Sequence, residues 1–122
     1  MENNREKIET ILKACDEKKA YSFSVIDISN ISTIADFFII CSVNNERQGE
    51  AVADEIIDKM SEIGVKLLHK EGYQTKRWIL LDYGFAVVHI FHKDERYVYD
   101  LEKLWSEGKD IDVEDYGIEN WN

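Results

Sequence analysis

The chain lacks proline altogether and contains few glycines and cysteines. Its 122 residues include six glycines and two cysteines. Without proline-rich or glycine-rich stretches, no segment has the composition of a linker, and the length is that of one ordinary domain. Cys15 and Cys41 lie in apolar stretches and do not follow the C-x-x-C spacing of metal or redox sites. We therefore expect both thiols to be reduced and buried, as in a cytoplasmic protein.

Long apolar runs and basic clusters are also missing. No apolar stretch approaches the roughly 20 residues that a membrane-spanning helix needs, so we expect no membrane association. Asp and Glu number 25 against 15 Lys and Arg, which gives a formal net charge of −10. Such a surface repels phosphate backbones. We therefore expect no direct sequence-specific binding to nucleic acid, and a basic protein is the more compatible partner.

Hydrophobic residues make up 44% of the chain, and their spacing predicts a folded α/β (α+β) protein. Helical periodicity predicts helices over about 4–19 and 46–63, the second capped by Asn44 or Asn45 and ended by Gly64. Alternating or continuous apolar stretches predict five strands, at 21–28, 36–42, 65–69, 77–82 and 85–91. A last helix, capped by Asp94, is expected to turn inward Tyr97, Val98, Leu101, Leu104 and Trp105. This order indicates a mixed five-stranded sheet flanked by helices.

The last residues differ in composition from the rest. From Ser106 onward six acidic residues stand against one basic residue, Lys109. We predict a folded domain over 1–106 and a mobile acidic tail over 107–122. The large apolar residues of that tail are Tyr116, Ile118 and Trp121.

The predicted hairpin at 77–91 has two unlike faces. A turn centred on Tyr83–Gly84 would place Trp78 opposite His89 and Asp82 opposite Phe85. Because side chains alternate along a strand, one face then carries Trp78, Leu80, Asp82, Phe85, Val87, His89 and Phe91. The other face carries Ile79, Leu81, Val88 and Ile90, which are all apolar and are expected to face the core.

The first of these faces has two interpretations. Its mixture of aromatic rings, an acid and an imidazole is typical of the centre of a protein–protein interface. Alternatively, a helix covers it, and a neighbouring acid or carbonyl satisfies His89. Arg96, Tyr99 and Glu102 are open to the same two interpretations, because Arg96 could equally belong to a solvated helix face, where ion pairs contribute little.

Patterns typical of enzymes are not found. His89 and His92 are three apart on a strand and would point to opposite faces, which argues against a shared metal ion. Cys41 and His89 form a nucleophile pair only if the fold brings them together. Asp36 and Asp82 are lone acids, and the glycines are isolated, so neither a two-metal clamp nor a phosphate cradle is present. We therefore expect that the protein is not an enzyme and that it binds neither a metal ion nor a cofactor.

Two stretches of the chain carry long motifs. Trp78 to Phe91 reads W-I-x-x-D-x-G-x-x-V-V-H-x-F, and Arg96 to Trp105 follows with R-x-x-Y-x-L-E-x-L-W. Upstream, Ser32 to Ser42 reads S-x-x-x-D-x-x-I-I-C-S. On these motifs the chain resembles the ribosome silencing factor family, also called the Iojap-like proteins, over roughly residues 4–106.

The resemblance implies a non-enzymatic, cytoplasmic repressor of translation. It implies binding to the large ribosomal subunit through its protein number fourteen, which blocks joining of the small subunit when nutrients are scarce. It further implies a homodimer that opens before docking. The residues that we assign to the partner-binding surface on this basis are Trp78, Asp82, His89, Phe91, Arg96 and Tyr99.

The resemblance also implies an architecture similar to that of nucleotidyltransferases, without their catalytic carboxylate set. Those enzymes carry a Gly-Ser pair followed by D-x-[DE] on the next strand. Here Phe38 stands two residues after Asp36, and no Gly-Ser pair precedes it. A nucleotidyltransferase-like enzyme acting on a small nucleotide is the alternative function, and a generic dimerisation module is the third.

Overall fold

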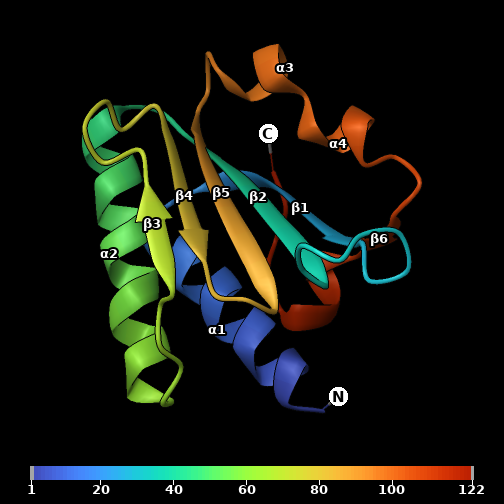
Figure 1. Cartoon of the computed structure of the whole chain (residues 1–122). Coiled ribbons are helices and arrows are strands. Elements are labelled where there is room, and N and C mark those ends of the chain that lie inside the picture. The colour runs from blue at the N-terminus through green and yellow to red at the C-terminus, as the bar shows by residue number, and fades with distance from the viewer. Residues whose placement is uncertain (1, 122) are drawn as a thin grey trace.

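A six-stranded mixed sheet forms the centre of the computed structural model, which describes residues 2–121 (Figure 1). The strands are β1 (Tyr21–Asp27), β2 (Phe37–Val43), β3 (His69–Glu71), β4 (Trp78–Asp82), β5 (Ala86–His92) and β6 (Lys109–Ile111). Their order across the sheet is β3-β4-β5-β2-β1-β6. β2 and β5 are parallel, and the other neighbouring pairs are antiparallel. The predicted mixed sheet is confirmed, but it has a sixth strand.

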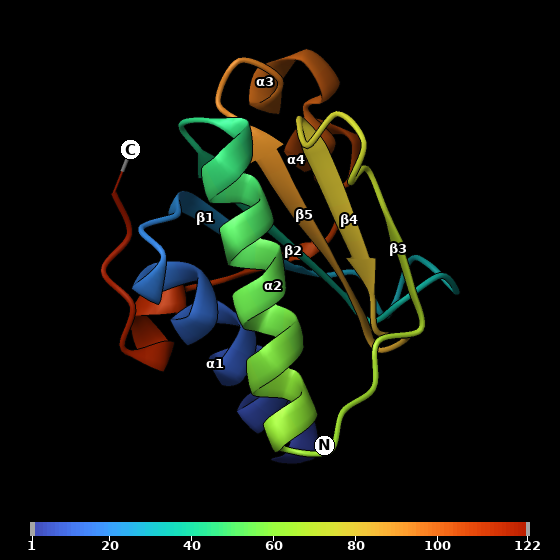
Figure 2. The same cartoon turned by 90° about the vertical axis from the view of Figure 1, so that its left-hand side faces the viewer.

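Two long helices cover one face of this sheet. They are α1 (Glu2–Glu17) and α2 (Glu46–Glu62), which stand in front of the sheet in Figure 2. α2 begins where the Asn45 side chain accepts a hydrogen bond from the Gln48 backbone N–H at 2.8 Å. It ends before Gly64, whose φ of 81° suits the left-handed position after a helix. Among residues 2–121, no helix has the length and apolar character needed to cross a bilayer.

The main core lies between these two helices and the sheet. Helical periodicity predicted the buried positions Ile8, Ile11, Leu12 and Cys15 of α1 and Val52, Ala53, Ile56 and Met60 of α2, whereas Ile63, predicted on the same stripe, is exposed. The apolar face of the hairpin is also buried in this core (Ile79, Leu81, Val88 and Ile90). Cys15 of α1 and Cys41 of β2 are both buried there and unpaired, as predicted. A hydrogen bond to Cys41, together with burial, raises the pKa of the Cys15 thiol well above its ordinary value.

The third strand lies further along the chain than predicted. The sequence indicated a strand over 65–69, whereas β3 runs from His69 to Glu71 and pairs with β4. The backbone N–H of Val65 instead donates to the Met60 carbonyl, so the chain after α2 is still bonded to the helix end. Val65 and Leu67 are apolar because they pack against the main core from a loop.

The prediction of a mobile tail after residue 106 is wrong. β6 pairs with β1, and the 3-10 helix η1 (Val113–Tyr116) packs beside α1. Side chains of Val113, Tyr116 and Ile118 are buried in the main core. Further on, the Trp121 ring stacks on Tyr21 with centroids 4.8 Å apart. These few apolar residues cover the β1 edge, while the acidic residues between them face outward, so net charge alone was misleading.

The other face of the sheet is covered by two very short helices, α3 (Arg96–Tyr99) and α4 (Leu101–Leu104). In Figure 2, α4 lies behind the upper end of the sheet and α3 lies above that end. The single helix predicted here is wrong, because Asp100 adopts a left-handed conformation (φ 44°) and its carboxylate accepts from the Lys103 N–H to restart the helix. The expected N-cap Asp94 is likewise wrong, since the cap position belongs to Glu95.

This break changes which side chains point inward. Leu101 is buried and Trp105 packs against the same cluster, as predicted. Tyr97, Val98 and Leu104, which were also expected to point inward, are instead 71%, 72% and 71% exposed. The covered sheet face and this segment form a small core, made of Ile26, Ile28, Ala35, Phe38, Ile40, Val87, Phe91 and Leu101, with Trp78, Leu80 and Trp105 against it.

Candidate functional site

The hairpin face that mixes aromatic and polar residues is the face covered by α3 and α4. Of the residues predicted to share one face, Trp78, Leu80, Asp82, Val87, His89 and Phe91 do so in the ladder. The prediction is wrong for Phe85, which lies in the turn and packs against the main core. The predicted opposite partners are wrong, because Trp78 pairs with Phe91 and Asp82 with Val87. A shift of two residues keeps every side chain on its face, since the side-chain period of a strand is two.

The turn explains this shift. Gly84 has a φ of 86°, as expected for a tight hairpin. The Asp82 carboxylate accepts a hydrogen bond from the Gly84 N–H at 2.8 Å, and the Tyr83 N–H donates to the Ala86 carbonyl at 2.9 Å. The turn therefore extends to Ala86, and the partner of Asp82 on β5 is Val87, two residues later than predicted. Asp82 is thus half-buried and already has a role in shaping the turn.

Aromatic rings run across this face from α3 to the end of α4. The Trp78 ring contacts both Phe91, 4.9 Å away between centroids, and Tyr99, 4.5 Å away, and these two rings are 6.0 Å apart. On the far side, the Phe38 ring contacts His89 at 4.8 Å and Trp105 at 5.3 Å. Aromatic pairs at these separations contribute about 0.5–1.5 kcal/mol each beyond their buried area. The rings therefore hold the two short helices on the sheet.

His89 lies beneath these rings and is only 4% exposed. Its Nδ1 accepts a hydrogen bond from the Trp78 indole N–H at 3.0 Å. Its Nε2 has no hydrogen-bond partner among the described residues. Burial lowers the pKa of His89 to about 4, because the charged imidazolium is poorly solvated there. The ring is therefore neutral near pH 7.

Arg96 fastens the covering segment to the sheet. Its guanidinium is 2% exposed, donates to the Ser42 hydroxyl at 2.7 Å and donates to the Glu102 carboxylate at 3.1 Å. The Ser24 hydroxyl donates to the same carboxylate at 3.0 Å. Partial burial works to raise the Glu102 pKa, but the bonds and charge of Arg96 outweigh it and hold that pKa below its ordinary value. The alternative interpretation, in which Arg96 belongs to a solvated helix face, is therefore wrong.

The six residues assigned to partner binding thus fall into two groups. His89, Phe91 and Arg96 are buried and cannot touch a partner while α3 and α4 stay in place. Trp78 and Asp82 are half-buried, and Tyr99 is 48% exposed. Leu80 is also half-buried on this face, and the exposed Tyr97, Val98 and Leu104 belong to the segment that covers it. Their apolar character was visible in the sequence, but the helix break that turns them outward was not.

The described residues do not form the arrangements that the metal-dependent and nucleophilic enzymes considered above require. Within residues 2–121, no group of three His, Cys, Asp or Glu side chains is placed to hold a metal ion. Cys41 pairs with Ile90 on β5 and faces the main core, whereas His89 faces the small core, so the two cannot act together. Asp36 is exposed, and its backbone N–H and carbonyl bond to Phe85 and Ile28.

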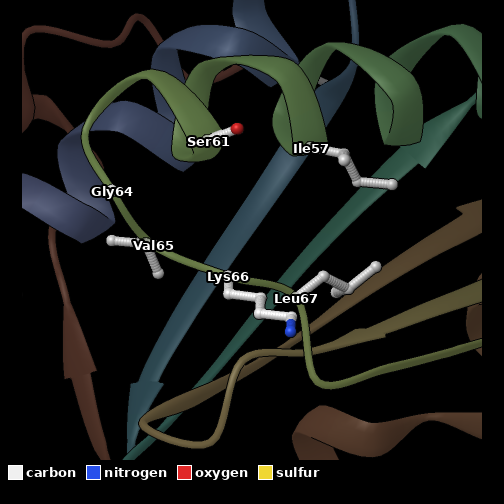
Figure 3. Close-up of a pocket in the computed structure, with 6 residues that line it drawn as sticks. All are labelled: Ile57, Ser61, Gly64, Val65, Lys66 and Leu67. Carbon is white, nitrogen blue, oxygen red and sulfur yellow. The ribbon is translucent and has the colours of Figure 1, made fainter.

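A pocket of about 440 Å³ opens at the end of α2 (Figure 3). It is lined by Ile57, Ser61, Gly64, Val65, Lys66 and Leu67. The loop after Gly64 forms one wall and the last turns of α2 form the other. Its titratable lining residue is Lys66 alone, so it offers no acid–base pair and no metal ligands.

Comparison with known proteins gives one consistent family. Residues 1–121 match the family model described as "Ribosomal silencing factor during starvation". The chain is similar to Ribosomal silencing factor RsfS of Halalkalibacterium halodurans, at 43% identity over 92% of this chain and 96% of that one. It is 41% identical to the protein of the same name from Bacillus subtilis, over 95% of this chain and 98% of that one. A solved structure from Bacillus halodurans superposes with a TM-score of 0.78 at 41% identity, covering 88% of this chain and 97% of that one.

Proposed function

Because this chain belongs to the ribosomal silencing factor (RsfS, Iojap-like) family, we propose that it represses translation by binding the large ribosomal subunit. The family is one of silencing factors and not of enzymes. The finer mechanism that we propose is steric. The protein docks on ribosomal protein number fourteen, prevents the small subunit from joining, and so lowers translation when nutrients are limiting.

The observation that carries this proposal is a partly exposed strip along β4, which we call the docking patch (Trp78, Leu80, Asp82 and Tyr99). Three of its members alternate along β4 with side chains buried in the main core. The fourth, Tyr99, contacts the Trp78 ring from α3, with centroids 4.5 Å apart and the rings tilted by 45°. A half-exposed Trp that rests on a fixed aromatic base resembles the central anchors of protein interfaces, where a few residues supply most of the affinity.

The charge of the chain indicates the kind of partner. With a net charge of −10, the protein is attracted to basic surfaces and repelled by exposed phosphates. Asp82 places one carboxylate at the end of the docking patch. A basic ribosomal protein satisfies both features, whereas naked ribosomal RNA satisfies neither.

Two further parts of the proposal concern the free protein. We propose that it is cytoplasmic and that it forms a homodimer which opens before docking. The exposed apolar residues on α3 and α4 support self-association, because patches of this kind otherwise favour aggregation. Sedimentation equilibrium tests this point, and a monomer at all concentrations up to high micromolar would contradict it.

The alternative, an enzyme similar to nucleotidyltransferases, lacks support at the positions that it needs. Asp36 and Asp82 are the carboxylates that it would use, and no third acid joins them among the described residues. Calorimetry with a magnesium–nucleotide complex separates the two proposals, because the silencing factor should show no heat of binding.

Co-sedimentation with separated ribosomal subunits tests the proposed function directly. The protein should pellet with large subunits and stay in the supernatant with small subunits or bare ribosomal RNA. Equal binding to naked RNA with a steep dependence on salt would overturn the assignment of a protein partner, because counterion release is the mark of phosphate contacts.

A further inference from the structure

We propose that His89 is a positioning residue for docking: its imidazole fixes the Trp78 indole in the orientation that the partner meets. The inference rests on the proposed function, because it concerns the same docking patch. It assigns a task to a residue that is buried and touches no partner itself.

The geometry around Trp78 carries this inference. Stacking on Phe91 and tilted contact with Tyr99 restrain the plane of the indole, with centroid distances of 4.9 and 4.5 Å. Stacking alone does not determine which edge of the ring points inward. The bond from the indole Nε1 to His89 Nδ1, at 3.0 Å, decides this by holding the N–H edge against the buried imidazole.

The bond also determines the state of His89. An indole N–H can only donate, so Nδ1 must be unprotonated and the single proton of the neutral ring must lie on Nε2. That Nε2–H is buried and has no acceptor among residues 2–121. An unpaired buried donor costs stability. An apolar residue like its neighbours Val87 and Phe91 would avoid this cost, so the imidazole is best explained by the acceptor that it offers to Trp78.

The surroundings keep His89 neutral over the range in which the protein works. The groups that face the ring are Phe38 from β2, Trp78 from β4 and Phe91 from its own strand, and none of them titrates in this range. On the covering segment, the ion pair of Arg96 and Glu102 is bonded to Ser42 and Ser24. With a pKa of about 4, set by burial, His89 stays an acceptor above about pH 5.

Three variants test the positioning role. His89→Phe keeps an aromatic ring but removes the acceptor, and His89→Asn keeps an acceptor near the position of Nδ1. Trp78→Phe removes the donor. For the folded fraction of each sample, His89→Phe should bind large subunits about fivefold more weakly, the loss expected for one hydrogen bond. His89→Asn should recover most of that loss, and His89→Phe should have no further effect in the Trp78→Phe background.

A second measurement reports on the bond without ribosomes. In the NMR spectrum, the Trp78 indole N–H should exchange slowly with water in the wild type and in His89→Asn, and quickly in His89→Phe. Unchanged affinity of His89→Phe, or an equal loss in the Trp78→Phe background, would overturn the positioning role and leave the proposed function intact. Failure of the wild type to bind large subunits would instead overturn the proposed function.

Discussion

The two faces of the sheet differ in residue composition and in the length of the helices that cover them. The face under α1 and α2 is almost wholly apolar and is sealed by helices of 16 and 17 residues. The face under α3 and α4 has a small apolar core, a buried imidazole and a partly buried ion pair, and its covering helices have four residues each. Alternating residues of β4 belong to one or the other, so a single strand contributes to both.

This difference between the two faces indicates that they have different roles, one in stability and one in function. The main core buries continuous apolar surface, which is the dominant favourable contribution to folding. The other face retains features that cost stability: among the described residues, the buried His89 Nε2 and Glu102 Oε1 have no hydrogen-bond partner, whereas the main core has one such atom, the Tyr83 hydroxyl. It also leaves large apolar side chains in solvent. Such departures from the rules of good packing are expected where a surface serves a partner. We therefore propose that the first face mainly supplies stability and that the second serves docking.

The largest effect should come from breaking the main core on β4. Ile79→Ala removes a fully buried side chain and should lower the free energy of unfolding by about 4 kcal/mol. Its neighbour Leu80 is half-buried on the other face, so Leu80→Ala should lower it by about half as much. Chemical denaturation measures both, and equal losses would contradict the distinction between the faces.

Protonation of His89 at acid pH should lower the free energy of unfolding of the protein. Its pKa is about 4 in the folded protein and about 6.5 when unfolded, so between these values the unfolded state binds the proton and the folded state does not. The stabilisation is present above pH 6.5 and is lost as pH falls towards 4, by about 3 kcal/mol in total. His89→Phe should lack this loss. A difference in stability between wild type and variant that does not change with pH would contradict the prediction.

Loss of the buried guanidinium should have a smaller effect. Arg96→Ala leaves the partly exposed Glu102 carboxylate and the Ser42 hydroxyl without their donor, and should cost about 2 kcal/mol. It should also loosen α3, which hydrogen exchange of the segment would detect. Arg47→Ala is the matched control, because Arg47 is exposed on α2. Equal effects of the two changes would mean that the ion pair of Arg96 and Glu102 does not hold α3 and α4 on the sheet.

The smallest expected effect on stability concerns Tyr83, a residue of the main core. Tyr83 is buried in the main core, and its hydroxyl has no partner among the described residues. Burial raises its pKa to about 12. Tyr83→Phe should stabilise the protein by about 1 kcal/mol without changing ribosome binding. Tyr73→Phe serves as the control, because the Tyr73 hydroxyl donates to Asp54 at 3.4 Å and its loss should bring no gain.

Much of this arrangement could be predicted from periodicity. Alternation alone assigned Ile79 and Leu81 to the core and Trp78 and Asp82 to the other face, and helical spacing located α1 and α2. The hairpin partners were two residues out, because the turn is decided by the bonds of Asp82 and Tyr83, which no pattern encodes. The paired residues of the ladder still lie on the predicted faces, because an error of two residues equals one full side-chain period.

The remaining differences have long-range causes. β6 has three residues and is rich in charge, so it is a strand only because β1 offers it an edge. Arg96 is buried only because Ser24 and Ser42, far away in sequence, meet it and Glu102. The outward turn of Tyr97 and Val98 follows from the left-handed Asp100, a conformation that is uncommon for residues other than glycine and that periodicity does not predict.

The central claim is that the docking patch binds the large subunit, and one paired measurement tests it most directly. Melting temperature and large-subunit affinity should be measured on the same samples of Trp78→Ala and of Lys13→Ala, a change at an exposed ion pair on α1. After correction for the folded fraction, we predict that Trp78→Ala binds about thirtyfold more weakly, as expected for a central interface Trp, while Lys13→Ala binds normally. If the affinity of Trp78→Ala follows its folded fraction alone, Trp78 belongs only to the small core, and docking takes place elsewhere.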